Sequence, residues 1–238
     1  MSSKSLPKSP QLHRRLQAGF QIPKNYKDPE EDDEGALNLN YDHHDDGCML
    51  HWDDEGEKFL MHQNFFDVFW NDFKTILNHQ KTILNDFWFL IDLGEDSEIP
   101  TEKEAAKAMA EKLKEILGPR KFRCELFQMD LLEKEPFLST LSLMDSQILR
   151  QIEISNVEDE VYTELTSEDV GNLEQWKNSR ILITNKIQLD VPLDDILRFD
   201  TVETRLKTLT SEDVGMLKNN LTVMLKIRIQ TTTTRGSG

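Results

Sequence analysis

Segments with a helical hydrophobic pattern alternate with strand-like segments from about residue 65 to about residue 230 of this chain. In the helix-like segments apolar residues recur three and four positions apart, as they do between Phe65 and Leu77. A neighbouring parallel strand requires a crossover of about a dozen residues, which a helix supplies. The alternation therefore predicts βα units and a mainly parallel sheet. The predicted strands cover residues 85–93, 122–131, 151–155, 181–184, 202–209 and 224–230.

The spacing between successive predicted strands is roughly 20–36 residues, which is in the range of leucine-rich-repeat solenoids. A strict L-x-x-L-x-L frame, however, is not present in the sequence. From the spacing and the alternation together we predict an α/β fold in the form of an open, curved, leucine-rich-repeat-like array of βα units.

Two helix starts are predicted by a repeated nine-residue frame, L-T-S-E-D-V-G-x-L, at residues 165–173 and 209–217. In each copy the leucine before the threonine and the valine four residues after the threonine form the pattern of a hydrophobic staple. The glutamate of each copy falls in the first helical turn, where negative charge is favourable. The two copies therefore predict helices over about 167–179 and 211–221.

The predicted helix caps within this frame are a threonine and an aspartate in each copy. The hydroxyl of Thr166 or Thr210 would accept a hydrogen bond from the amide three residues on. The carboxylate at that third position, Asp169 or Asp213, would accept a bond from the threonine amide in return. Both pairs are predicted to be structural.

A further helix has the clearest start and stop in the sequence. Thr101 with Glu104 resembles a capping box, and the apolar positions that follow run from Ala105 to Leu117. Gly118, followed by a proline, is typical of a helix end.

Residues 1–35 are predicted to be a disordered tail, because they combine four prolines with an acidic run and few large apolar side chains. The last eight residues, 231–238, are predicted to be a second disordered tail. The folded domain is therefore expected to cover residues 36–230.

The charge of the chain argues against two classes of partner. Twenty-eight Lys and Arg against 44 Asp and Glu give a net charge of −16, which repels nucleic-acid phosphates and anionic lipids. No apolar run approaches the about 20 residues of a spanning helix, and the N-terminus has no apolar signal core. We therefore expect an intracellular protein, in the cytoplasm or nucleus, that binds neither nucleic acid nor membranes and keeps Cys48 and Cys124 reduced.

No catalytic, cofactor or metal site is predicted. Three histidines and Cys48 gather between residues 41 and 51, but their spacing does not match the pairs that place four ligands around zinc. An acidic hairpin turn is the favoured interpretation of this segment, and a metal-dependent enzyme is a distant alternative. Cys124 lies in a predicted strand as a buried structural thiol, and no glycine-rich phosphate loop is present.

Two tryptophans leave alternatives open at this point. Trp176 is spaced three residues from Leu173 on one helix, which favours a core position over a role as a binding hot spot. Phe87, Trp88 and Phe89 cannot all point to one side of a strand. Trp88 is then either exposed or covered by another helix.

Several segments of the chain resemble the FTH domain found in nematode F-box A proteins. The segment that follows the first repeat resembles the L-E-Q-W-K-x-A motif of that domain. Residues 71–81, 149–154 and 199–213 resemble further parts of it, as does the short hairpin that ends at Gly47-Cys48, so that the similarity extends in order over residues 36–230. The residues that match the motif are Leu173, Glu174, Gln175, Trp176 and Lys177.

The resemblance implies a non-catalytic protein-interaction domain. In the family, an F-box binds a Skp1-type adaptor of a cullin ubiquitin ligase and the FTH domain receives the protein to be ubiquitinated. The implied partner is an unidentified target protein, and a Skp1-type adaptor only if an F-box is present. Residues 1–35 do not contain the L-P-x-x-x-L-x-x-I-L opening of an F-box. A stand-alone binding module is therefore the alternative function.

Overall fold

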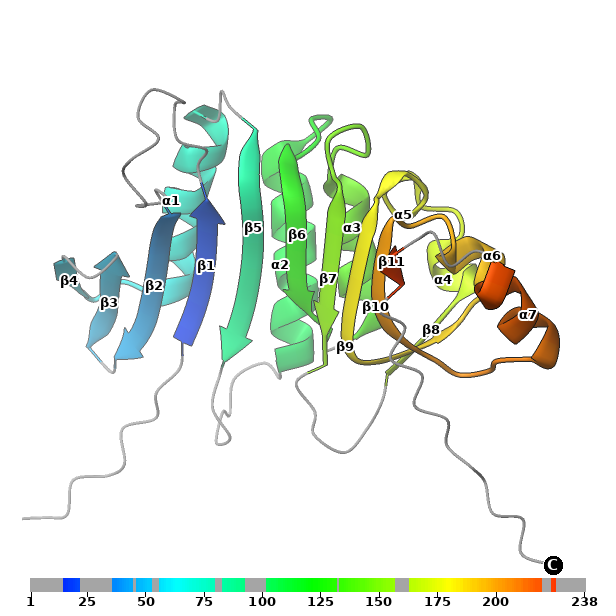
Figure 1. The fold of residues 1–238 in the computed structure, drawn as a ribbon. Coiled ribbons are helices and arrows are strands. Elements are labelled where there is room, and N and C mark those ends of the chain that lie inside the picture. The colour runs from blue at the N-terminus through cyan, green and yellow to red at the C-terminus, as the bar shows by residue number, and fades with distance from the viewer. Residues whose placement is uncertain are drawn as a thin grey trace, which may run out of the picture.

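A computed structural model describes residues 15–21, 36–44, 46–52, 56–79, 83–92, 102–131, 133–156, 163–219 and 224–225. These residues form one sheet, with helices packed against it (Figure 1). The strands are β1 (Arg15–Gln21), β2 (Ala36–His44), β3 (Gly47–Trp52), β4 (Gly56–Met61), β5 (Leu84–Asp92), β6 (Cys124–Asp130), β7 (Gln151–Ser155), β8 (Thr163–Thr166), β9 (Ile181–Asp190), β10 (Thr201–Leu206) and β11 (Met224–Leu225).

The sheet has an antiparallel part and a parallel part. Its strand order is β11-β10-β9-β7-β6-β5-β1-β2-β3-β4, with β8 paired to the second half of β9. All pairs from β5 to β11 are parallel, whereas β1 to β4 pair with each other and with β5 in the antiparallel sense. The predicted α/β class with a parallel sheet is confirmed, and the antiparallel part is an addition that the sequence pattern did not predict beyond the hairpin near Gly47.

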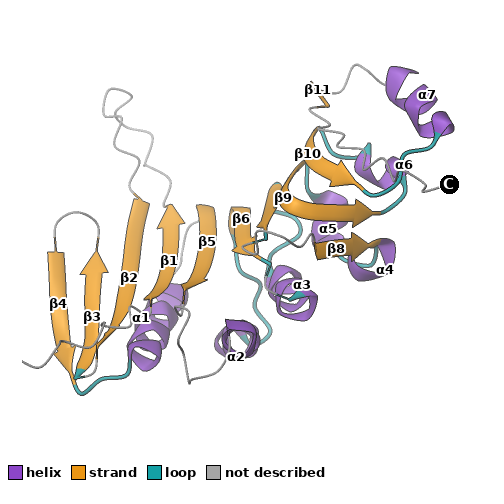
Figure 2. Ribbon diagram, turned by 90° about the horizontal axis from the view of Figure 1, so that it is seen from below, coloured by secondary structure: helices purple, strands orange, loops and turns teal. Residues whose placement is uncertain are grey.

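Helices pack on one face of this sheet, where their apolar stripes cover the strands (Figures 1 and 2). In the first of them every buried residue belongs to the predicted stripe from Phe65 to Leu77, apart from the neighbouring Val68. The helices are α1 (Phe65–His79), α2 (Glu102–Leu117), α3 (Lys134–Leu143), α4 (Ser167–Val170), α5 (Glu174–Asn178), α6 (Leu193–Ile196) and α7 (Ser211–Asn219).

The units of β6, β7, β9 and β10 bury the same three positions, spaced three and then two residues apart, and the unit of β5 buries the first two of them. The middle positions of the units, from Phe87 through Ile152 to Val202, are in register from strand to strand. Because the residues between them alternate to the other face, one frame orients the whole parallel part. The buried residues of the frame are Leu84 and Phe87; Cys124, Phe127 and Met129; Leu149, Ile152 and Ile154; Ser179, Leu182 and Thr184; Phe199, Val202 and Thr204.

Polar members of this frame are satisfied inside the sheet. The hydroxyls of Thr184 and Thr204 lie 2.7 Å apart and share a buried hydrogen bond. The Ser179 hydroxyl donates to the carbonyl oxygen of Gln175 over 2.7 Å. Burial of these hydroxyls therefore does not leave a polar group without a partner, which would cost about 1–3 kcal/mol.

Strand β9 keeps its buried face through an irregularity at its centre. Lys186 has a left-handed backbone with φ of 57°, a conformation that costs energy for a residue with a side chain. The extra residues place Ile187 and Leu189 in the buried layer. The strand is consequently longer than the predicted 181–184, and its second half pairs with β8.

The prediction of a disordered tail over residues 1–35 is wrong for residues 15–21. These residues form β1, which is inserted between β2 and β5 and pairs with both. A strand in the middle of a sheet gains two ladders of backbone hydrogen bonds, which compensates for its modest apolar content. Residues 1–14 and 22–35 of the predicted tail lie outside the described residues. The same holds for the C-terminal residues 231–238 and for the proposed cap Thr101.

The predicted helix over 167–179 is divided into α4 and α5. The chain leaves the first helix at Gly171, whose amide donates to the Ser167 carbonyl, and enters the second after Leu173. The predicted helix over 105–117 ends as expected, because Gly118 takes the left-handed conformation at φ of 58° and its amide donates to the Lys114 carbonyl.

Candidate interaction surface

The family-like motif of residues 173–177 lies at the junction between α5, α3 and the strand units. Gln175 is buried, and its side-chain Nε2 donates to the carbonyl oxygens of Ser142 at 3.1 Å and Met144 at 2.7 Å. Those carbonyls lie at the C-terminal end of α3, where backbone acceptors have no partner within the helix. Gln175 of α5 therefore caps the C-terminal end of α3.

The other members of the motif divide into buried and exposed positions. Trp176 is 1% exposed and meets the ring of Phe199 edge to face, with 5.4 Å between ring centroids. Leu173 packs partly buried against the core, whereas Lys177 and Glu174 form a surface ion pair at 3.0 Å. Because Trp176 is enclosed, its side chain cannot contact a partner as a binding hot spot, which was the alternative that the sequence left open.

In the first repeat, the Asp169 carboxylate forms a capping box with Thr166. Its Oδ2 accepts from the Thr166 amide at 2.8 Å and from the Thr166 hydroxyl at 2.9 Å, and Lys134 of α3 donates to the same oxygen at 2.9 Å. Burial opposes ionisation of Asp169, but these hydrogen bonds outweigh it and lower its pKa. Leu165 and Val170 are both buried beside the cap. In this copy the ion pair between Lys134 and Asp169 therefore links α4 to α3.

The second repeat makes the same bonds at the surface. The Thr210 amide and hydroxyl both donate to Asp213 Oδ2 at 2.7 Å, and the Asp213 amide donates to the Thr210 hydroxyl at 3.1 Å. These bonds lower the pKa of Asp213. Val214, the counterpart of the buried Val170, is 38% exposed. The repeated sequence is therefore a repeated helix start, whose valine is buried only in the first copy.

The histidine-rich segment forms the β2–β3 hairpin, and its side chains diverge. Tyr41 and Cys48 are fully buried on the helix side, where the Tyr41 hydroxyl donates to Asp72 at 3.2 Å. His51 lies on the other face, 3.3 Å from Asp42. Among the residues that the structure describes, no three His, Cys, Asp or Glu side chains gather in a way that could hold a metal ion.

Both cysteine thiols are buried and far from a reactive state. Burial and the carboxylates of Asp42 and Asp72 raise the pKa of Cys48 to about 11. Burial and Asp86 raise the pKa of Cys124 further, and its thiol contacts the Met144 sulfur at 3.6 Å. Because the thiolate is the nucleophilic form, neither group is suited to catalysis.

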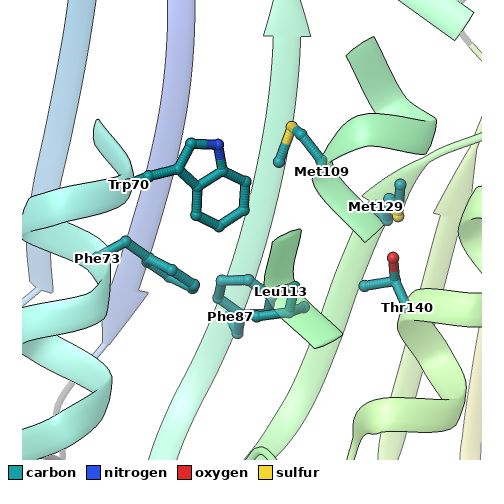
Figure 3. A pocket seen from close by; sticks show the side chains of 7 residues that line it. All are labelled: Trp70, Phe73, Phe87, Met109, Leu113, Met129 and Thr140. Carbon is teal, nitrogen blue, oxygen red and sulfur yellow. The ribbon is translucent and has the colours of Figure 1, made fainter. Parts of the chain in front are cut away.

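A small cavity lies in the core between α1, α2, α3 and strands β5 and β6 (Figure 3). Its volume is about 20 Å³, which is close to the space of a single water molecule. The Thr140 hydroxyl at its wall already donates to the Pro136 carbonyl at 2.8 Å. The cavity is therefore a packing gap and too small for a cofactor. Its lining consists of Trp70, Phe73, Phe87, Met109, Leu113, Met129 and Thr140.

The sheet face opposite the helices, here called the open face, has no described helix over its parallel part (Figures 1 and 2). Its central row runs across five strands in register, through residues that lie between the buried positions of the frame. A second row lies two residues earlier on each strand. The central row is Trp88, Gln128, Glu153, Ile183 and Glu203, and the second row is Asp86, Leu126, Gln151, Ile181 and Thr201.

The central and second rows carry acidic and apolar side chains and no Lys or Arg. Asp130, in the same strand as Gln128 and on the same face, is half-buried, and this burial raises its pKa. Basic groups lie at the margin of the rows, where Arg205 follows Glu203 by two residues on the same face and Arg150 and Arg180 come within 4.0 Å of Glu125 and Asp200. The open face is thus a broad surface with acidic character. Of these residues only Trp88 stood out in the sequence, as either exposed or covered by another helix, and it is half-buried on this face. Each of the others is also the alternating neighbour of a buried strand residue.

Comparison with known proteins identifies relatives of this chain. The family model described as the FTH domain matches residues 107–231, which contain most of the parallel part of the sheet. F-box A protein 224 of Caenorhabditis elegans is 26% identical over 195 residues, covering 79% of this chain and 48% of the relative. The chain thus spans about half the length of that relative. No solved structure matches this chain. Within the described ranges, none of the helices has the length and apolar character that crossing a membrane requires.

Proposed function

The chain belongs to the FTH domain family, and from this relationship we propose that it is a non-catalytic protein-interaction module. In the finer form of the proposal it is the substrate-recognition part of an F-box-type adaptor of a Skp1–cullin ubiquitin ligase. The protein would act inside the cell, in the cytoplasm or nucleus, and its partner would be the protein that is to be ubiquitinated.

The observation that carries this proposal is the one-sided covering of the sheet. Helices bury one face, and the other presents in-register rows of side chains between the buried positions. Such rows can vary without disturbing the core, because strand side chains alternate between the two faces. A rigid, extended surface of this kind is suited to binding proteins. We propose in addition that the array is leucine-rich-repeat-like, which the shared spacing of its buried positions supports.

A non-catalytic role is supported by the state of the reactive side chains. The two thiols are buried with raised pKa values, and the motif residues Gln175 and Trp176 are enclosed by the fold. Enzymes commonly hold reactive groups in a cleft with pKa values matched to their task. The buried thiols and the enclosed motif residues of this chain do not offer such an arrangement.

A stand-alone binding module is the second candidate. It would use the same open face but would not associate with a ligase. The two candidates agree on the surface and differ in whether a Skp1-type protein and a cullin accompany the chain.

Quantitative co-precipitation of the tagged natural protein tests the proposal. The surface variant carries Gln128→Arg and Ile183→Arg in the central row, and the matched control carries Ser139→Arg and Asn178→Arg on exposed positions of the helix layer. Target proteins should be lost with the surface variant and retained with the control. Recovery of a Skp1-type protein and a cullin with all forms supports the adaptor, whereas their absence beside a surface-dependent target supports the stand-alone module. If both variants retain the same proteins, the open face does not bind the target.

A further inference from the structure

From the chemistry of the open face we propose that its occupant is an extended, basic segment of a partner protein, laid across the strands along the central row. The inference deepens the proposed function and rests on it, since it specifies the chemical class of the target segment. The residues that would contact the segment come from β5, β6, β7, β9 and β10.

The geometry of the central row defines a straight track. Trp88 is paired with Gln128, Gln128 with Glu153, and both Glu153 and Glu203 with Ile183. Adjacent strands lie about 4.8 Å apart, so that the two glutamates, two strands apart, are separated by about 10 Å along the row. An extended chain of the polyproline II type rises about 3.1 Å per residue and has three residues per turn. Basic side chains three residues apart would therefore lie on one side of the segment, about 9 Å apart, and match both glutamates.

Charge favours a basic occupant over any other. The central and second rows contain the carboxylates of Glu153, Glu203 and Asp86 and no Lys or Arg, and the next row adds the Asp130 carboxylate and one cation, Arg205, so that carboxylates outnumber cations among these residues. The chain as a whole has a net charge of −16, which attracts cationic segments over a longer range. The same charges would repel nucleic acid.

Apolar groups between the carboxylates favour a segment that is not purely basic. Leu126, Ile181 and Ile183 are each half-buried on the open face, so a small apolar side chain of the partner would remove further apolar area from water. Trp88, also half-buried, lies at the β5 end of the row and offers an indole to a Lys or Arg by a cation–π contact. A segment that combines basic residues three positions apart with apolar residues between them therefore fits best.

Glu153 has an internal partner that fixes its position. Gln151 of the second row donates from its side-chain Nε2 to Glu153 Oε1, which leaves Oε2 for a ligand. Arg150 and Arg180, two of the basic groups at the margin, lie next to Glu125 and Asp200. They border the track without entering it.

The experiment measures binding of a labelled synthetic peptide of repeated Lys-Ser-Leu triplets to the purified chain by fluorescence anisotropy, and follows Trp88 by intrinsic fluorescence. A second peptide replaces every Lys by Glu. The surface variant is Glu153→Gln with Glu203→Gln, and the control is Glu111→Gln with Glu135→Gln on exposed positions of α2 and α3. Both variants remove two negative charges, so their net charge is the same.

We expect saturable binding of the basic peptide, about tenfold weaker with the surface variant because two ion pairs are lost, and within about twofold of wild type with the control. Binding should change the tryptophan emission, and Trp88→Phe should abolish that change. Equal weakening by both variants, equal binding of the acidic peptide, or no binding of the basic peptide would overturn the inference. If the peptide fails while a target still depends on the open face in co-precipitation, only the basic chemistry is wrong. If co-precipitation shows no dependence on that face, the proposed function itself fails.

Discussion

Gln175 donates a hydrogen bond of 2.7 Å to the carbonyl oxygen of Met144, a residue 31 positions earlier in the chain. The same amide group reaches the Ser142 carbonyl, so one side chain of α5 satisfies two acceptors at the end of α3. The neighbouring Trp176 reaches in the other direction, to Phe199 before β10. The motif that marks the family is therefore a joint between successive units of the array, and it supports the open face from behind.

Replacing Gln175 by leucine should destabilise the protein although the size of the side chain is nearly kept. The Met144 carbonyl would lose its buried donor, which costs about 1–3 kcal/mol, whereas the Ser142 carbonyl would keep the bond from Lys121. Urea unfolding followed by circular dichroism measures the loss. Glu174→Gln, on the exposed neighbour, is the control and should stay within about 0.5 kcal/mol of wild type. Equal stability of Gln175→Leu and wild type would refute the capping role.

Truncation of Trp176 to alanine should lower the free energy of unfolding by about 3–5 kcal/mol, because the indole is fully enclosed and packs against Phe199. Trp176→Phe keeps an aromatic ring at the site and should cost less. Thermal unfolding of both variants provides the comparison. A Trp176→Ala protein as stable as wild type would show that the side chain is not part of the core.

The two repeats allow a matched pair of substitutions in the same local sequence. Val170→Ala should cost about 1–2 kcal/mol, since Val170 is 1% exposed, whereas Val214→Ala should cost less than about 0.5 kcal/mol at 38% exposure. Denaturant unfolding of the two single variants gives the difference. Equal losses would mean that the second repeat is packed as tightly as the first.

The charged carboxylate of Asp169 should stabilise the folded protein at mildly acidic and higher pH, and this stabilisation should be lost in strong acid. Hydrogen bonds from Thr166 and Lys134 lower the pKa of this carboxyl against the effect of burial, so its contribution is complete above the unfolded-state value of about 3.9. The contribution is lost as the pH falls through the lower, folded-state pKa. The stability gap between wild type and Asp169→Asn should therefore be constant above about pH 5 and shrink below about pH 4. A gap that widens on acidification would contradict this assignment.

Neither thiol should react with a disulfide reagent at pH 8 while the protein is folded. Burial raises the pKa of Cys48 to about 11 and that of Cys124 further, which leaves little thiolate and no access for the reagent. Ellman's reagent should modify both only after urea is added. Rapid modification of either thiol in the native protein would reopen the possibility of cysteine chemistry.

Periodicity predicted much of the parallel part of this fold, because several of its elements have a complete local pattern. The stripe from Phe65 to Leu77 and the alternation around Val202 both correspond to buried faces. Residues 151–155 were predicted without error as β7. In these segments local hydrophobic order and tertiary burial agree.

Other elements carry no such local sign. The helix α3 begins after Glu133 without a side-chain cap, and proline in its first turn weakened the pattern. The strand β1 contains a single large aromatic residue, Phe20, and is held by its two neighbours. The repeating buried frame was hidden because Cys124, Ser179 and other polar or small residues occupy positions where leucine was sought.

The candidate surface could be predicted only in part for the same reason. The motif around Trp176 stood out in the sequence because its composition is the most distinctive. A distinctive residue that is buried, however, contributes to packing and not to the surface. Outward-facing residues such as Gln128 and Ile183 stand out only once the buried register of all five strands is known.

Site-specific photocrosslinking can show directly whether the target protein binds the open face. A photoreactive phenylalanine analogue is introduced at Gln128 on the open face or at Ser139 on the exposed side of α3, and covalent adducts are identified after irradiation in cells. The open-face account predicts that the target protein forms an adduct with the probe at position 128 and none with the probe at position 139. Adducts with the target from position 139 alone, or equally from both positions, would contradict it.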